Sequence, residues 1–152
     1  MKKNKFLLKR IKEMIFNVTK IDNVTLRIIG DGELKDYVKK QVELFPSKIE
    51  YLGALSNDDI FKEISESDLL LLVSKKDGWG ATINESLLVG TPVLATSTCG
   101  AGVLLDNDYR GEQFYWNNNL REKITKWIEK DDLGKLNQEG HLIRCIGWQK
   151  SL

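Results

Sequence analysis

Hydrophobic residues recur along the chain in two arrangements, one with the spacing of a helix and one as short unbroken runs. In residues 1–18 the apolar positions lie three or four residues apart with charged residues between them, which predicts an amphipathic helix. Residues 69–73 are five consecutive aliphatic residues, too few for a helix and without polar alternation. Such a run is typical of a strand that is buried on both faces in a parallel sheet covered by helices.

The same two arrangements, with glycine, proline and polar residues at the boundaries, predict the remaining elements. The expected helices are 1–18, 33–45, 56–67, 81–89, 119–130 and 131–145. The expected strands are 24–29, 49–52, 69–73, 92–95 and 114–115. Strands that alternate with helices predict a Rossmann-like, doubly wound parallel α/β sheet with right-handed crossovers. Ligands of such sheets bind outside the carboxyl ends of the strands, which selects the loops 30–32, 53–55 and 74–80.

Composition narrows the class of protein. The 152 residues are enough for one domain, and 41% hydrophobic with 30% charged residues is ordinary for a folded globular chain. A net charge of +1 argues against a large nucleic-acid-binding surface. Two cysteines are too few for a disulfide scaffold, and no apolar run reaches the roughly 18 residues of a membrane span. We therefore expect a soluble, cytoplasmic, single-domain chain that binds no nucleic acid.

The loop 74–80 and the helix after it carry the most informative chemistry. Gly78 and Gly80 allow the backbone to approach a ligand closely. The N–H groups of Gly80, Ala81 and Thr82 lie at the start of the expected helix, where they have no partners within it. Together with the helix dipole, these amides favour an anion such as a diphosphate.

Two acidic residues flank these amides. Glu85 follows Thr82 by three residues and shares its helical face. A carboxylate there can accept two hydrogen bonds from a vicinal diol such as that of ribose. Asp77 lies on the loop side of the same amides and suits a second polyhydroxylated group. A diphosphate between two diol-binding acids describes a nucleotide-sugar site.

This run of residues resembles the group 1, or family 4, set of retaining, Leloir-type glycosyltransferases with the GT-B fold. The family signature has an acid, seven residues and a glutamate, with glycine–aromatic–glycine after the acid and Gly-x-Pro-Val after the helix. The matching residues are Gly78-Trp79-Gly80, Glu85 and Gly90-Thr91-Pro92-Val93. The resemblance extends in order over most of residues 3–115 and implies the C-terminal, donor-binding half of such an enzyme, of the kind used in polysaccharide or glycolipid biosynthesis.

The resemblance implies a role for each matching position. The candidate catalytic residues are Asp77, which would contact the sugar hydroxyls, and Glu85, which would bind the ribose. The residues implied in donor binding are Lys3, Gly30, Gly53, Ala54, Leu55, Gly78, Gly80, Ala81, Thr82 and Glu85. The loop 53–55 would lie against the base and the amides of 80–82 against the diphosphate. Lys3 would offset the charge of the leaving group in place of a divalent metal, so that no metal or other cofactor is expected.

The resemblance also implies parts of the enzyme outside this chain. The first strand of the family's domain, which carries a diphosphate-binding arginine, would precede Met1. An N-terminal acceptor domain would be supplied in cis or in trans, and any peripheral contact with the inner face of a membrane would be made by that half. We therefore expect the isolated chain to bind a UDP-, GDP- or ADP-linked sugar and to transfer nothing.

Two other classes of protein fit the residues. One is a non-catalytic fragment or split-enzyme subunit that needs a partner, and the other is a flavodoxin-like nucleotide-binding or signalling domain. The latter would need clustered acids after the first strand, for which only Asp31 and Glu33 are candidates. His141 and Cys145 lie four residues apart on the last expected helix, but one histidine and two cysteines do not complete a structural zinc site.

Overall fold

The computed structural model of the protein describes residues 2–72, 80–96, 104–105, 110–115, 119–129 and 141–146. The helices are α1 (Lys2–Thr19), α2 (Lys35–Leu44), α3 (Asn57–Ser65), α4 (Gly80–Leu88) and α5 (Leu120–Glu129). The strands are β1 (Val24–Ile29), β2 (Ile49–Gly53), β3 (Leu69–Leu72), β4 (Val93–Thr96), β5 (Gly111–Phe114) and β6 (His141–Ile146). In the described part of the chain, none of the helices has the length and apolar character that a membrane span requires.

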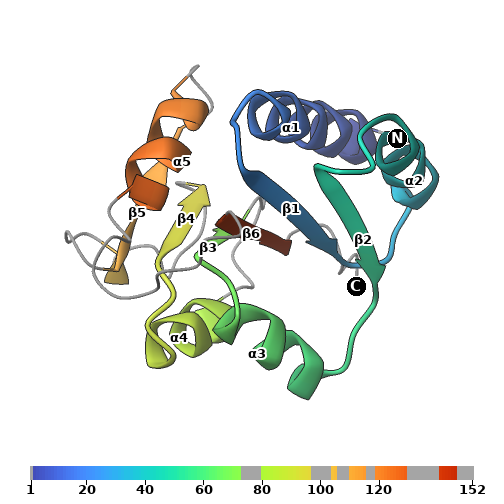
Figure 1. Cartoon of the computed structure of the whole chain (residues 1–152). Helices are drawn as coiled ribbons and strands as arrows, with labels where there is room; N and C mark the ends of the chain where they lie inside the picture. Colours follow the sequence, from blue (N-terminus) through green and yellow to red (C-terminus); the bar gives the residue numbers. More distant parts are fainter. Residues whose placement is uncertain are drawn as a thin grey trace.

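The described strands form one parallel sheet in the order β2-β1-β6-β3-β4-β5, with helices on both faces (Figure 1). This arrangement confirms the Rossmann-like α/β class. The two expected central strands are neighbours, because Leu70 of β3 is the register partner of Val93 of β4. The fifth strand begins at Gly111, three residues before the expected start, and Tyr115 lies just beyond it.

The last expected helix, 131–145, is wrong for residues 141–145, which belong to the central strand β6. β6 pairs with β1 over six residues and with β3 over four. A position between two strands offers unpaired N–H and C=O groups on both sides, and these favour an extended segment over a helix. His141 and Cys145 therefore lie on a strand, and the helical spacing considered for metal ligands does not apply to them.

Two hydrophobic layers cover the sheet. The first core layer lies under α1, α2 and α5, and the second lies under α3 and α4 (Figure 1). Successive residues of a strand point to opposite faces, so that β3 contributes to both layers. Leu69 and Leu71 belong to the first layer, whereas Leu70 and Leu72 belong to the second. Burial on both faces is the physical reason for the unbroken apolar run in this strand.

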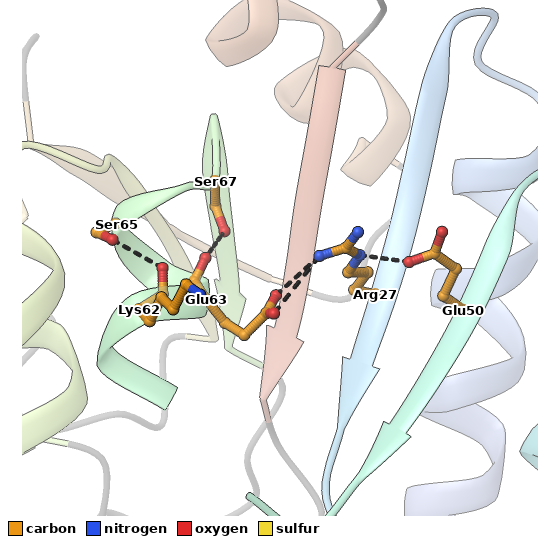
Figure 2. A network of polar contacts seen from close by, with 6 residues as sticks. All are labelled: Arg27, Glu50, Lys62, Glu63, Ser65 and Ser67. Atoms are coloured by element: carbon orange, nitrogen blue, oxygen red, sulfur yellow. Dashed lines mark hydrogen bonds and ion pairs between the residues drawn. The ribbon is translucent and has the colours of Figure 1, made fainter. Parts of the chain in front are cut away.

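One charged cluster interrupts the second face of the sheet. Arg27 of β1 forms ion pairs with Glu50 of β2 and, at 3.2 Å, with Glu63 of α3 (Figure 2). Burial alone would lower the pKa of Arg27, but its hydrogen bonds to the two carboxylates outweigh burial, so that this pKa is raised. Because β6 separates β1 from β3, the Arg27–Glu63 pair connects β1 to the helix that precedes β3.

We predict that Ile143→Pro destabilises the protein by roughly 3 kcal/mol or more, because proline removes a ladder N–H from a strand that is paired on both sides. Ile143 is the register partner of both Leu26 and Leu69. Asn57→Pro is the control, because it adds proline at the first position of α3 after Ser56, which has φ −65° and ψ 161°. The free energies of unfolding of both proline variants are measured by urea denaturation, monitored by circular dichroism. Ile143→Val separates the effect of proline on the backbone from the effect of losing side-chain atoms. Equal stability of the two proline variants would contradict the central position of β6.

Candidate functional site

The carboxyl ends of the parallel strands share one edge of the sheet. At this edge β1 ends at Ile29, β2 ends at Gly53, and α4 begins at Gly80 after β3. Two of the three loops selected from the sequence, 30–32 and 53–55, lie within the described residues. The third is described only from Gly80 onward, so that Asp77 and Gly78 lie outside the described residues. Lys3 lies in the first turn of α1, which begins at Lys2.

Hydrogen bonds hold the loops after β1 and β2 together. The N–H of Gly30 donates to the carbonyl of Gly53 at 2.8 Å, and the hydroxyl of Tyr51 donates to the carbonyl of Gly30 at 2.8 Å. Gly30 and Gly53 have φ values of +145° and +71°, which favour glycine over residues with a side chain. The sequence places glycine at both strand ends, and the structure shows that these glycines form one junction.

A pocket of about 250 Å³ opens beside this junction, and we call it the β1–β2 pocket. Its lining residues are Asp31, Lys35, Lys39, Tyr51, Leu52, Gly53 and Ala54. Lys35 and Lys39 lie one turn apart on α2, and the Nζ of Lys35 is 3.9 Å from an oxygen of Asp31. Burial, with the nearby charge of Asp31, raises the pKa of Tyr51, so that the phenol stays protonated and can donate to Gly30.

Sequence reasoning missed Lys35, Lys39 and Tyr51 as lining residues. The lysines belong to a helix rich in charges, where a solvated face is the usual interpretation. A signal was present, because Asp31, Lys35 and Lys39 follow one another at intervals of four residues. The interval places Lys35 and Lys39 on one face of α2, and Asp31 lies in the loop between β1 and that helix.

α4 lies on the opposite face of the sheet from α2 and presents Glu85 on its flank. Ile83 and Ser86 are fully buried, whereas Thr82 and Glu85 are half-buried and share one side of the helix. The helix begins at Gly80, one residue before the expected start. The amides of Gly80, Ala81 and Thr82 therefore belong to the first turn, which has no acceptors within the helix.

The carboxyl end of α4 is anchored by a buried polar cluster. The hydroxyl of Ser86 donates to the carbonyl of Thr91 at 2.8 Å, and the N–H of Thr91 donates to the carbonyl of Ser86 at 2.9 Å. The hydroxyl of Thr91 in turn donates to the carbonyl of Ile64, the last buried residue of α3, at 2.9 Å. Gly90 adopts φ +77° between them, a conformation typical of a helix end. The Gly-Thr-Pro run thus fixes α4 to α3 and to the start of β4.

The structure brings together only some of the residues selected from the sequence. Gly53 and Ala54 line the β1–β2 pocket, and Gly30 is bonded to Gly53. Leu55 packs against the second core layer. Thr82 and Glu85 lie on α4, whose first turn is at the same edge of the sheet. Within the part of the chain that the structure describes, no three His, Cys, Asp or Glu residues are grouped to hold a metal ion.

We predict that Thr91→Val lowers the free energy of unfolding by about 1–2 kcal/mol, because it removes a buried hydroxyl donor at nearly constant volume. Thr91 is 1% exposed, and its hydroxyl bond links α4 to α3. Thr19→Val is the control, because the Thr19 hydroxyl donates to the Phe16 carbonyl in an exposed position. Chemical denaturation of both variants is the measurement. A loss for Thr91→Val no larger than that for Thr19→Val would argue against the anchor.

Comparison with known proteins gives a family and several relatives. The family model described as "Glycosyl transferases group 1" matches residues 2–140. The uncharacterized glycosyltransferase MJ1178 of Methanocaldococcus jannaschii is 30% identical over 153 residues, which cover 95% of this chain and 40% of that protein. The sulfoquinovosyl transferase SQD2 of Arabidopsis thaliana is 23% identical over 109 residues, which cover 70% of this chain and 21% of that protein. The chain thus spans less than half the length of these relatives, and no solved structure matches it.

Proposed function

Because this chain belongs to the group 1 glycosyltransferases, we propose that it is the part of such an enzyme that binds a nucleotide diphosphate sugar. The complete enzyme would transfer a hexose from that donor to an acceptor hydroxyl with retention of anomeric configuration. The bond between the sugar C1 and the diphosphate would break, and a bond from C1 to the acceptor oxygen would form. The nucleoside diphosphate would leave, and the proton of the acceptor hydroxyl would pass to the phosphate oxygen released from C1.

The start of α4 is the observation that carries this proposal. Its first-turn amides lie at the carboxyl edge of the sheet, at the same edge as the loops after β1 and β2. Amides without helical partners, together with the dipole of a nine-residue helix, favour a diphosphate. They stabilise the charge that develops on the leaving group without a divalent metal, and Lys3 is proposed to add a cation there.

Glu85 is proposed to bind the ribose of the donor. Glu85 is half-buried on α4, three residues after Thr82, and the two side chains share one side of the helix. Its carboxylate therefore lies one turn from the N–H groups at the start of that helix. An ionised carboxylate accepts hydrogen bonds from both hydroxyls of a vicinal diol. Asp77 keeps its proposed role toward the sugar hydroxyls on the evidence of the sequence alone.

The acceptor is proposed to be held by another part of the enzyme, in the same chain or in a partner. Holding an acceptor hydroxyl against C1 supplies a large share of the rate, since it replaces a bimolecular encounter with a positioned reaction. A facing domain would also exclude water from the diphosphate and strengthen every charge contact there. The 152-residue chain is therefore expected to bind donor nucleotides without transferring sugar.

We predict that Glu85→Ala weakens the binding of nucleoside diphosphates to this chain about tenfold, because one charge-assisted pair of hydrogen bonds to the ribose is lost. Isothermal titration calorimetry with UDP, GDP and ADP is the measurement. Glu122→Ala is the control, because Glu122 is exposed on α5, a helix that covers the other face of the sheet from α4. Affinities that are equal in the two variants, or an absence of binding by all three nucleotides, would overturn the donor-site proposal.

A further inference from the structure

The outward side of α1 carries a stripe of lysines. In the part of this helix whose side chains the structure describes, the exposed positions are Lys9, Lys12 and Phe16. They follow one another at intervals of three and four residues, and the same intervals continue back along the helix to the positions of Lys5 and Lys2. At 3.6 residues per turn, these five positions fall within about 80° of the helix circumference. None of the five is acidic, so that every charged residue of the stripe is a lysine.

The opposite side of α1 is held in the protein core. Its apolar residues belong to the first core layer, which fixes the helix on the sheet and turns the lysines outward. The acidic residue of α1, Glu13, lies 3.1 Å from the guanidinium of Arg10 and is only half-buried beside it. The residues that face the core are Ile11, Met14, Ile15 and Val18. Cover of the sheet therefore explains the apolar side of α1, but not its lysine side.

Exposed apolar side chains lie at the end of the stripe. Phe16 is 58% exposed, and the Nζ of Lys20, in the turn after α1, is 5.4 Å from the centroid of its ring. At the end of α2, Leu44 is 67% exposed and Phe45 is also exposed. Exposed large apolar side chains next to a line of charges are typical of an interaction surface.

The ends of the two helices lie next to one another. The Nζ of Lys48, which precedes β2, donates to the carbonyl of Ile21, which follows α1, at 2.6 Å. The N–H of Lys48 donates to the carbonyl of Phe45 at 3.0 Å. Both helices cover the same face of the sheet (Figure 1). We call their shared outward side the α1–α2 surface, and its residues are Lys9, Lys12, Phe16, Lys20, Leu44 and Phe45.

Charge is distributed unevenly between the two faces of the molecule. The other exposed charges of α2 offset one another, since Lys39 and Lys40 are accompanied by Asp36 and Glu43. On the opposite face of the sheet, the exposed charges of α3 and its C-cap are mainly acidic, with Asp58, Asp59 and Glu66 against Lys62. A negatively charged surface would therefore attract the α1 side and repel the α3 side, so that the protein would approach it in one orientation.

We propose that the α1–α2 surface binds an anionic lipid bilayer, an inference that does not depend on the proposed function. Lysines near an anionic leaflet are attracted to it within about one Debye length. Exposed phenylalanine and leucine side chains gain free energy when they enter the interface, and attachment is strong when charge and apolar contact act together. A polyanion such as a nucleic acid would use the lysines but leave Phe16, Leu44 and Phe45 in water. The bilayer uses both parts of the surface.

Vesicle co-sedimentation of the 152-residue chain tests this proposal. Vesicles of equal parts phosphatidylcholine and phosphatidylglycerol are compared with vesicles of phosphatidylcholine alone. Binding is expected to be at least about tenfold tighter to the anionic vesicles, because several lysines contribute. The preference is expected to fall when the salt concentration is raised from about 0.1 M to about 0.5 M, because the Debye length shortens.

Two matched pairs of variants locate the surface. Lys9→Gln is expected to weaken binding to anionic vesicles about fivefold, whereas Lys62→Gln removes the same charge from α3 and is expected to have little effect. Phe16→Ala is expected to weaken binding by a similar factor of about five, because apolar contact with the interface is lost. Phe61→Ala is its control, because Phe61 is an exposed phenylalanine of α3. Circular dichroism of each variant verifies that the fold is intact.

The outcomes distinguish a bilayer from other partners and from the donor site. Equal binding to the two kinds of vesicle, no binding to either, or equal effects of Lys9→Gln and Lys62→Gln would overturn the inference. Binding to a DNA duplex as tight as to anionic vesicles, with neither weakened by Phe16→Ala, would assign the lysines to a polyanion and would also overturn it. Nucleotide affinity of Lys9→Gln, measured by calorimetry, is expected to be unchanged, so that failure here leaves the proposed function untouched.

Discussion

The rest of the structure depends on the pairing of β6 with two neighbours at once. In the described sheet β1 and β3 each pair with β6 and not with one another, so that β6 joins the β2–β1 half to the β3–β4–β5 half. The candidate site uses both halves, because the β1–β2 pocket belongs to the first and α4 to the second. The ion pair between Arg27 and Glu63 is a second connection across the same strand (Figure 2). The strand β6, this ion pair and the core layer shared by the two halves together fix the separation of the two parts of the site.

Polar groups at the carboxyl edge of the sheet differ in function from those in the protein interior. In the interior, the hydroxyls of Ser86 and Thr91 donate hydrogen bonds to backbone carbonyls and so join α4 to α3 and to the start of β4. A buried hydroxyl without such a bond would carry a desolvation cost. At the carboxyl edge, the amides that begin α4 have no acceptors within the helix, and the side chains of Asp31, Lys35 and Lys39 line the β1–β2 pocket. The two buried hydroxyls thus serve to join elements, whereas the polar groups of the pocket lie at the edge where parallel sheets bind their ligands.

The sequence predicts most of this fold because its signals are local. The unbroken aliphatic run of β3, the glycine at position 90 after α4, and the order of strands and helices each report on a few neighbouring residues. The strand β6 was missed because residues 141–146 are extended only in the presence of β1 and β3, which lie far away in the chain. The β1–β2 pocket was missed for a related reason. Its lining residues come from a loop, a helix and a strand, and no local sequence pattern predicts that these segments lie together. The roles of Asp77 and Glu85 remain predictions.

The anchor at Ser86 and Thr91 also bears on how fast a ligand can leave. α4 is held at its carboxyl end, while the amides proposed to face the donor are at the opposite end of its nine residues. Such a helix is about 13 Å long, so that a rotation of about 10° around the anchored end moves the first turn by about 2 Å. A hydrogen bond does not survive a displacement of that size. For the diphosphate proposed to bind at that end, the stiffness of the anchor formed by Ser86 and Thr91 would then contribute to the residence time, although both residues lie at the other end of the helix.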